Sequence, residues 1–197
     1  SKTPNRATDT TRQPGSTFKI LAAYSAALDA GGLTLASVQD DAPYTYAGAN
    51  GKSVNNYDRR YRGFTTLREA ITDSINIVTV KTLAQAGVSL GWQYVQEYGF
   101  TTVDSRDMNE ALALGGITQG VSNLELTAAY AAIANQGTYI KPKFYTKILD
   151  HDGNVLIDNT TPESHTVIKD TTAWLLTSAM EDVMTSGTGT SAYFGSS

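Results

Sequence analysis

The chain has 197 residues, of which 41% are hydrophobic and 17% are charged, a balance that supports one domain with its own core. Its 15 Lys and Arg against 19 Asp and Glu give a net charge of −4, and the absence of a basic block argues against nucleic-acid binding. The chain has no Cys and only two His, which excludes disulfides, thiolate metal sites and a three-histidine metal site. No apolar run reaches the ~20 residues of a membrane span, and no signal peptide opens the chain.

The first third of the chain is predicted to contain a loop, a helix and a long irregular segment. Residues 1–15 are polar and contain two prolines without a periodic pattern, so we expect a loop. Over residues 16–30 apolar side chains recur at helical spacing, and the glycine pair at 31–32 ends the run. Residues 33–64 are rich in Tyr, Asn, Gly and Asp, which predicts a surface excursion with short strands or turns.

Two capping boxes predict helix starts in the middle of the chain. The sequence TLRE at 66–69 places Glu three residues after Thr, and a helical pattern follows it to about residue 86, with a break near Ser74. A shorter helix is expected over 89–98. The sequence SNLE at 122–125 is the second capping box, and it opens a helix of small residues that a glycine ends.

A hairpin and a last helix are predicted for the C-terminal third. Residues 143–149 and 154–158 flank an Asp-Gly pair at 152–153, which is a strong signal for a two-residue hairpin turn. Asp170 is expected to cap a helix over 171–186. Helix therefore dominates the predicted structure.

Ser16 and Lys19 have a spacing that allows nucleophilic catalysis. Three helical residues advance the chain by about 300° and ~4.5 Å, so both side chains share one face. The lysine amine can then take the hydroxyl proton, and the helix N-terminus favours the negative charge that develops. The spacing alone is also typical of a solvated serine with a surface lysine, and about one chance match is expected in a chain of this length.

A Ser-x-Asn triplet offers two further polar side chains. Ser74 and Asn76 stand where the helical pattern is interrupted, so both side chains can face a cleft, although turn or cap roles are commoner for these residues. A rival triplet, Ser53-Val54-Asn55, lies in the irregular segment, and spacing does not choose between the two.

Several segments together resemble the penicillin-binding proteins, the serine transpeptidases of bacterial cell-wall synthesis. Residues 12–19, RQPGSTFK, resemble the active-serine motif, residues 57–70 resemble the approach to the second motif, and residues 74–76 stand where the family has Ser-x-Asn. The stretch ALALGGITQGVSNLELTAAYAAIANQGTY is similar to the segment after that motif, especially in the bifunctional class A branch. TSGTGTSAYFG resembles the segment before the third motif, Lys-Thr-Gly. The likeness covers nearly all of residues 5–195 and assigns the triplet at 53–55 to a loop.

The resemblance implies an α+β, β-lactamase-like fold with a helical cluster against an antiparallel sheet, and D,D-transpeptidase activity on peptidoglycan stem peptides. Ser16 would attack the carbonyl of the penultimate D-alanine, and Lys19 would act as its base. Ser74 would relay the proton to the leaving amine, and Asn76 would hydrogen-bond the substrate. No metal or organic cofactor is implied, and β-lactams would acylate Ser16 as substrate mimics.

No Lys-Thr-Gly or Lys-Ser-Gly occurs in the chain, which departs from the family pattern. We therefore expect residues 1–197 to be one partial transpeptidase domain, mainly helical, with the rest of its sheet outside the sequence. The resemblance also implies an extracytoplasmic location at the bacterial membrane through an upstream anchor. Its partners would be stem peptides and β-lactams, without nucleic acid. A β-lactamase, a penicillin sensor and a non-catalytic remnant remain alternative functions.

Overall fold

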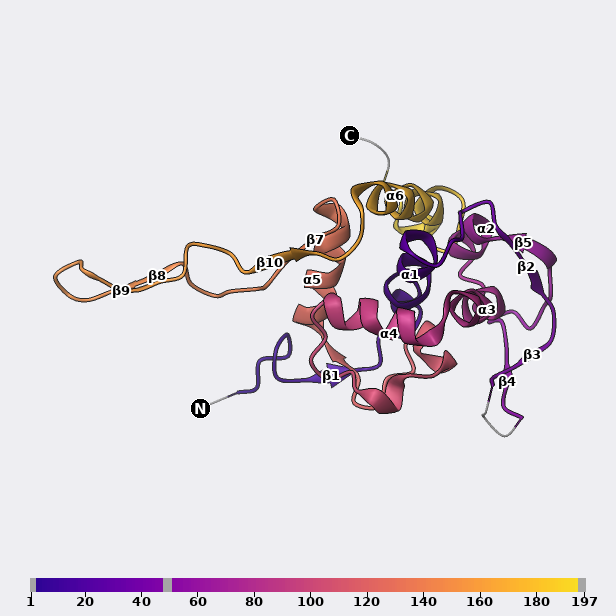
Figure 1. Ribbon diagram of the computed structural model, residues 1–197, viewed down its shortest axis with the longest axis horizontal. Helices are drawn as coiled ribbons and strands as arrows, with labels where there is room; N and C mark the ends of the chain where they lie inside the picture. The colour runs from indigo at the N-terminus through magenta and orange to yellow at the C-terminus, as the bar shows by residue number, and fades with distance from the viewer. Residues whose placement is uncertain (1–2, 48–50, 195–197) are drawn as a thin grey trace.

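The computed structural model describes residues 3–47 and 51–194. Within these ranges the chain forms a cluster of helices with short antiparallel ribbons at its periphery (Figure 1). The α-helices are α1 (Ser25–Asp29), α2 (Leu67–Thr72), α3 (Asn76–Ala86), α4 (Val88–Glu97), α5 (Asn123–Ala134) and α6 (Asp170–Thr185). No helix among the described residues combines the length and apolar character that a membrane span requires.

The segment from Phe18 to Ala27 forms the centre of the core. Its side chains are 7% exposed or less, because α3, α4 and α6 surround it. A helix that is buried on all sides needs no polar face, which explains why the segment is apolar apart from Lys19 and Ser25. The predicted regular helix over 16–30 is wrong in detail: a 3₁₀ turn, η1 (Gly15–Thr17), and a π-helix, η2 (Ile20–Tyr24), precede α1.

Both predicted capping boxes are confirmed. The Thr66 hydroxyl accepts a hydrogen bond from the Glu69 amide at the start of α2, and Ser122 and Glu125 form the same arrangement at the start of α5. The predicted cap of the last helix is wrong, because Asp170 is the first residue of α6 and no side chain caps that helix. The Asp170 carboxylate instead accepts a hydrogen bond from the amide of its neighbour Thr171.

The predicted break at Ser74 is confirmed, since α2 ends at Thr72 and α3 begins at Asn76. Further short 3₁₀ helices are η3 (Ser105–Asp107), η4 (Glu110–Leu114) and η5 (Thr190–Ala192). The sequence pattern gave no sign of these three turns.

In the part of the chain that the structure describes, ten short strands pair into five separate two-stranded antiparallel ribbons. The irregular segment over 33–64 contains strands and turns as predicted, whereas the expected loop over 1–15 contains a strand that pairs with a segment more than 100 residues away. The pairs are β1 (Thr11–Arg12) with β6 (Val121–Ser122), β2 (Val38–Asp41) with β5 (Gly63–Thr66), β3 (Tyr44–Thr45) with β4 (Ser53–Val54), β7 (Thr138–Ile140) with β10 (Ser164–Thr166), and β8 (Lys147–Leu149) with β9 (Val155–Asp158).

The β8–β9 hairpin projects away from the helical cluster, in orange in Figure 1. All residues of both strands are exposed. The hairpin is confirmed, but its connection spans residues 150–154 instead of the predicted two-residue turn. The Asp150 carboxylate closes this loop by accepting hydrogen bonds from the amides of Asp152 and Asn154, at 2.9 and 2.8 Å.

Candidate active site

Ser16 lies in the 3₁₀ turn η1, where its side chain is exposed at a cavity of about 680 Å³. The turn begins at Gly15, whose φ of 58° lies in the left-handed region that glycine adopts without a steric penalty. The turn then leads directly into the buried central segment. Ser16 is therefore a surface residue on a rigid support.

Contacts from the segment around residue 117 hold the turn in place. Arg12 pairs with Val121 in the β1–β6 ribbon, and the Gln13 side chain hydrogen-bonds both backbone groups of Ile117. A Cβ on Gly115 would lie 2.6 Å from the carbonyl oxygen of Gly15, so the two backbones can approach this closely only because Gly115 has no side chain. No local sequence pattern had predicted this support.

Lys19 is nearly fully buried, with 3% of its surface exposed. Its Nζ donates hydrogen bonds to the Ser74 carbonyl oxygen at 2.6 Å, to Ser74 Oγ at 2.9 Å and to Asn76 Oδ1 at 2.6 Å. Burial disfavours the charged amine and lowers the pKa of Lys19 from 10.5 to about 8. Roughly one-tenth of the Lys19 side chain is therefore neutral at pH 7, far more than for an exposed lysine.

The break between α2 and α3 presents Ser74 to Lys19. Ser74 has a φ of 54°, a left-handed conformation that is uncommon for a residue with a Cβ. This conformation allows both the carbonyl and the hydroxyl of Ser74 to face the same amine. Asn76 begins α3 and donates through Nδ2 to the carbonyl oxygen of Asn55 at 2.7 Å, so its Oδ1 is left to accept from Lys19.

The structure brings all four predicted site residues to one place. Ser16, Ser74 and Asn76 line the cavity of about 680 Å³, and Ser16, Lys19 and Ser74 line an adjoining cavity of about 380 Å³. Among the described residues, the hydrogen bonds of Lys19 go to Ser74 and Asn76 and none goes to Ser16. The expected direct contact between amine and nucleophile is thus replaced by contact between the amine and the second motif.

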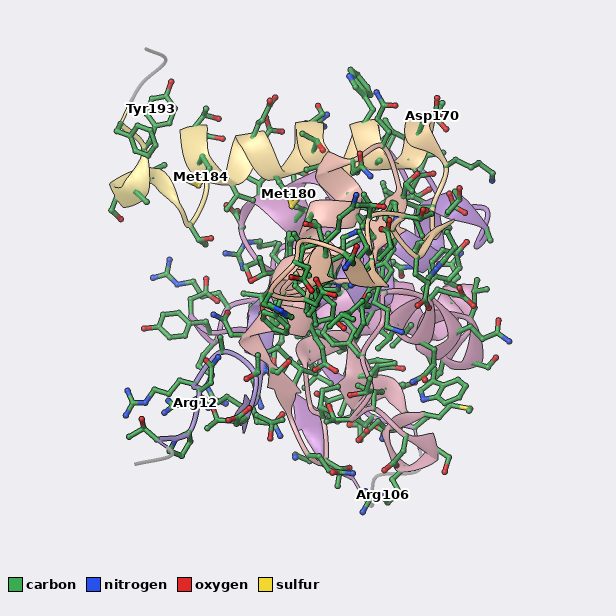
Figure 2. The ribbon with its side chains drawn as sticks, turned by 90° about the vertical axis from the view of Figure 1, so that its left-hand side faces the viewer. Arg12, Arg106, Asp170, Met180, Met184 and Tyr193 are labelled. Carbon is green, nitrogen blue, oxygen red and sulfur yellow. The ribbon has the colours of Figure 1, made fainter. Side chains whose placement is uncertain are left out.

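Helices α5 and α6 complete the walls of the smaller cavity. Tyr130 of α5 donates its hydroxyl to the Thr17 carbonyl oxygen at 2.6 Å, and burial raises the pKa of Tyr130 to about 12. Met180 and Met184 line the same cavity, and Figure 2 shows both on the side of α6 that faces the body of the molecule. Thr188, just beyond α6, lines both cavities.

The tyrosines of the irregular segment 33–64 differ in whether they line the larger cavity. Tyr57 is fully exposed and lines the larger cavity, whereas Tyr44 and Tyr46 pack partly buried against the core. Tyr61 is 53% exposed and is not among the residues that line this cavity. In the rival triplet, Ser53 belongs to β4 and takes no part in the site.

Comparison with known proteins agrees with this architecture. The family model of the penicillin-binding protein transpeptidase domain matches residues 2–195. The chain belongs to this family. Penicillin-binding protein 1F of Bacillus subtilis is 39% identical over 194 residues, covering 98% of this chain and 26% of the relative. Penicillin-binding protein 1A of Neisseria flavescens is 36% identical over 204 residues, covering 98% and 24%.

Solved structures of penicillin-binding proteins share the fold. The crystal structure of penicillin-binding protein 1A from Haemophilus influenzae has a TM-score of 0.83 and 28% identity, and the match covers 95% of this chain and 33% of that one. An imipenem acyl-enzyme complex of penicillin-binding protein A from M. tuberculosis has a TM-score of 0.80 at 22% identity, covering 92% and 46%. The α+β penicillin-binding fold is thereby confirmed. The chain spans about a quarter of the length of the two curated relatives.

Proposed function

We propose that this chain carries the acylation centre of a D,D-transpeptidase that cross-links peptidoglycan stem peptides. The observation that carries the proposal is the buried Lys19 amine, held by Ser74 and Asn76 in cavities that share Ser16 as a wall. Membership of the transpeptidase family supports the reaction class. The buried amine supplies a base that an exposed lysine would not supply at neutral pH.

In the acylation step, Lys19 takes the proton of the Ser16 hydroxyl, and Ser16 Oγ attacks the carbonyl carbon of the penultimate D-alanine. The backbone amide of Ser16 donates to the oxyanion that forms. The bond to the terminal D-alanine then breaks, and its nitrogen receives the proton from Lys19 through Ser74, whose Oγ is 2.9 Å from Nζ. Ser16 is left as an ester of the stem peptide.

In the second step, the amine of a neighbouring stem peptide attacks the ester carbonyl and releases Ser16. Lys19 accepts the proton that the attacking amine loses, and the serine oxygen is protonated again. Asn76 hydrogen-bonds the substrate backbone during both steps. The second donor to the oxyanion comes, in this proposal, from a strand outside residues 1–197. The reaction uses no metal and no organic cofactor.

The proposal places the site on the extracytoplasmic side of the bacterial membrane, where stem peptides occur. β-Lactams present an acyl carbonyl to the same serine and remain attached, which makes them inhibitors. The imipenem complex named above is an acyl-enzyme of a protein that shares the fold. Peptidoglycan stem peptides and β-lactams are therefore the proposed partners.

The test is to label the full-length protein with a fluorescent penicillin and to locate the adduct by peptide mapping. We expect the adduct on Ser16 alone, and complete loss of labelling in Ser16→Ala. Ser53→Ala is the matched control, because it removes a serine hydroxyl outside the site. An adduct on Ser74 or Ser53 would refute the assignment. Rapid release of the hydrolysed penicillin would favour a β-lactamase instead.

A further inference from the structure

A buried polar cluster lies behind the start of α3. Asn56 is 4% exposed, and its Nδ2 donates to both carboxylate oxygens of Asp41, at 2.8 and 3.0 Å, and to the Arg60 carbonyl oxygen at 2.8 Å. Its Oδ1 accepts from the backbone amide of Ile77 at 3.2 Å. Every polar atom of the Asn56 side chain is thus engaged, and one of its partners is the residue directly after Asn76.

Asp41 fixes the orientation of Asn56. Asp41 is fully buried, and its Oδ2 also accepts from the Arg62 amide at 2.9 Å, with the Arg62 guanidinium 3.9 Å away. A carboxylate only accepts hydrogen bonds, so Asn56 must turn its Nδ2 toward Asp41 and its Oδ1 toward α3. The buried charge therefore removes the alternative amide orientation.

The fixed Asn56 side chain and the neighbouring Asn55 both contact the start of α3, where Asn76 lines the cavity. Asn56 binds the Ile77 amide, while the carbonyl oxygen of the preceding Asn55 accepts from Asn76 Nδ2 at 2.7 Å. The segment 55–56 thus accepts two hydrogen bonds from the first turn of α3. Asn76 can present only its Oδ1 to Lys19, at 2.6 Å.

We propose that Asn56 and Asp41 are positioning residues for acyl transfer, which act by fixing Asn76 against Lys19. The inference rests on the proposed function, but the contact it concerns can be observed without catalysis. Asn56 lines the larger cavity beside Tyr57, but among the described residues the hydrogen bonds of Asn56 and Asp41 do not go to Ser16 or Lys19. Both act through Asn76, whose Oδ1 accepts the hydrogen bond from Lys19.

The test compares acylation kinetics in the full-length protein. In Asn56→Ala we expect the acylation rate constant at Ser16 to fall about 10–100-fold, as misplaced catalytic groups commonly cause, while the noncovalent dissociation constant for penicillin stays within about threefold. Asp41→Asn keeps the side-chain volume but weakens the acceptor, so a smaller loss is expected. Asp29→Asn is the control: Asp29 accepts from Tyr94 and Lys169 away from both cavities, so it should lower the thermal midpoint without slowing acylation.

A swap separates positioning from general loss of stability. The double variant Asp41→Asn with Asn56→Asp restores an amide–carboxylate pair and an acceptor for Ile77 but loses the donor to the Arg60 carbonyl oxygen. Its acylation rate should therefore lie below the parental rate and at least threefold above that of Asn56→Ala. Unchanged acylation in folded Asn56→Ala would overturn the inference, as would equal slowing by Asp29→Asn. If Asn56→Ala does not fold, the acylation rates of Asp41→Asn and of the double variant are compared with the parental rate, and parental rates in both would overturn the inference.

A failure of the proposed function can be distinguished from a failure of the positioning inference. If the parental protein does not label at Ser16, that function fails, and crystal structures of the parental protein and Asp41→Asn then test the positioning alone. The inference predicts that the contact between Lys19 Nζ and Asn76 Oδ1 lengthens or that the Asn76 amide turns over. An unchanged contact would overturn it.

Discussion

The walls of the Ser16 cavity and the β8–β9 hairpin depend on the rest of the protein to very different degrees. The Ser16 turn is supported by β6, by the backbone around Ile117 and by Tyr130 of α5, and it continues into a fully buried helix. The hairpin exposes every residue of its two strands, and its connection is closed by Asp150, which lies in that connection. Local turn chemistry specifies the hairpin, whereas the cavity is assembled from segments far apart in the sequence.

The largest expected effect follows from removing the amine at the centre of the cavity. Lys19→Ala should slow penicillin labelling by at least about 10²–10⁴-fold, which is the usual contribution of a positioned base. The thermal midpoint should stay within a few degrees, because the variant loses hydrogen bonds but no longer buries an amine. Stopped-flow labelling and a thermal melt measure the two quantities. If a folded Lys19→Ala variant were labelled by penicillin at the parental rate, Lys19 would not be the base.

The pH dependence of acylation tests the burial of the same amine. Since the pKa of Lys19 is lowered to about 8, roughly one-tenth of the side chain is neutral at pH 7 and nine-tenths at pH 9. The acylation rate should therefore rise about tenfold over this interval, with its midpoint near pH 8. A rate that is flat between pH 7 and 9 would show that Lys19 is not the titrating base.

The same shift predicts a pH dependence of stability. The unfolded chain binds the proton more tightly than the folded one, so stability from Lys19 increases as the pH rises from about 8 towards 10.5. Below pH 8 both states are protonated, and the cost of burying the charge is fully present. Lys19→Met should flatten this increase in denaturant titrations. If stability rose with pH as steeply in Lys19→Met as in the parental protein, another titrating group would be responsible for the increase.

Substitutions of Ser74 separate its hydroxyl from its backbone conformation. Ser74→Ala and Ser74→Gly both remove Oγ, so both should slow acylation, and less than Lys19→Ala does, because water can replace the relay. Only glycine relieves the φ of 54°, so Ser74→Gly should be the more stable of the two, by about 1 kcal/mol. Labelling kinetics and denaturant midpoints check this. A loss equal to that of Lys19→Ala would mean that the two residues act as one unit.

The sequence predicted the features that depend on local contacts, and it did not reveal the contacts between distant segments. The capping boxes at Thr66 and Ser122, the break at Ser74 and the hairpin were found because each depends on residues a few positions apart. The four candidate site residues were identified by their motifs, and their spacing along the chain does not reveal that Lys19 turns toward Ser74. That contact depends on tertiary packing.

Some of the features that were missed depend on residues far apart in sequence. The β1–β6 pairing and the Gln13–Ile117 contacts join segments more than 100 residues apart. Apolar periodicity does not distinguish a π-helix from an α-helix in a fully buried segment, so η2 was also missed. The adjacent glycines at 115–116 were the one local signal of a close backbone approach beneath Ser16.

Gly115→Ala tests that approach. The added Cβ would lie 2.6 Å from the carbonyl oxygen of Gly15, so the Ser16 turn must shift, and acylation should slow about tenfold. Gly32→Ala is a matched control, because both glycines have a φ of 72° and nothing lies within 4 Å of a Cβ at Gly32. The control should lose about 1 kcal/mol from backbone strain alone and should label at the parental rate. Equal labelling by the two variants would show that the contact does not position Ser16.

The smallest effect on the cavity is expected from the hairpin. Asp150→Ala removes the acceptor of the amides of Asp152 and Asn154, so the β8–β9 ribbon should open more often. Hydrogen exchange at Ile148 and Ile157 should accelerate, because these paired residues make their strand contacts with each other. Global unfolding and penicillin labelling should not change, since the hairpin lines neither cavity that contains Ser16.

Asp152→Ala provides the control for this variant, because the Asp152 side chain contacts His151 and does not close the loop. It should leave hydrogen exchange in the ribbon at the parental rate. If Asp150→Ala slowed acylation as much as Gly115→Ala, the hairpin would be coupled to the cavity, and the independence of the two regions would be wrong. If Asp150→Ala left exchange at Ile148 unchanged, pairing between the strands alone would hold the ribbon closed. The carboxylate would then select the loop conformation without determining how often the hairpin opens.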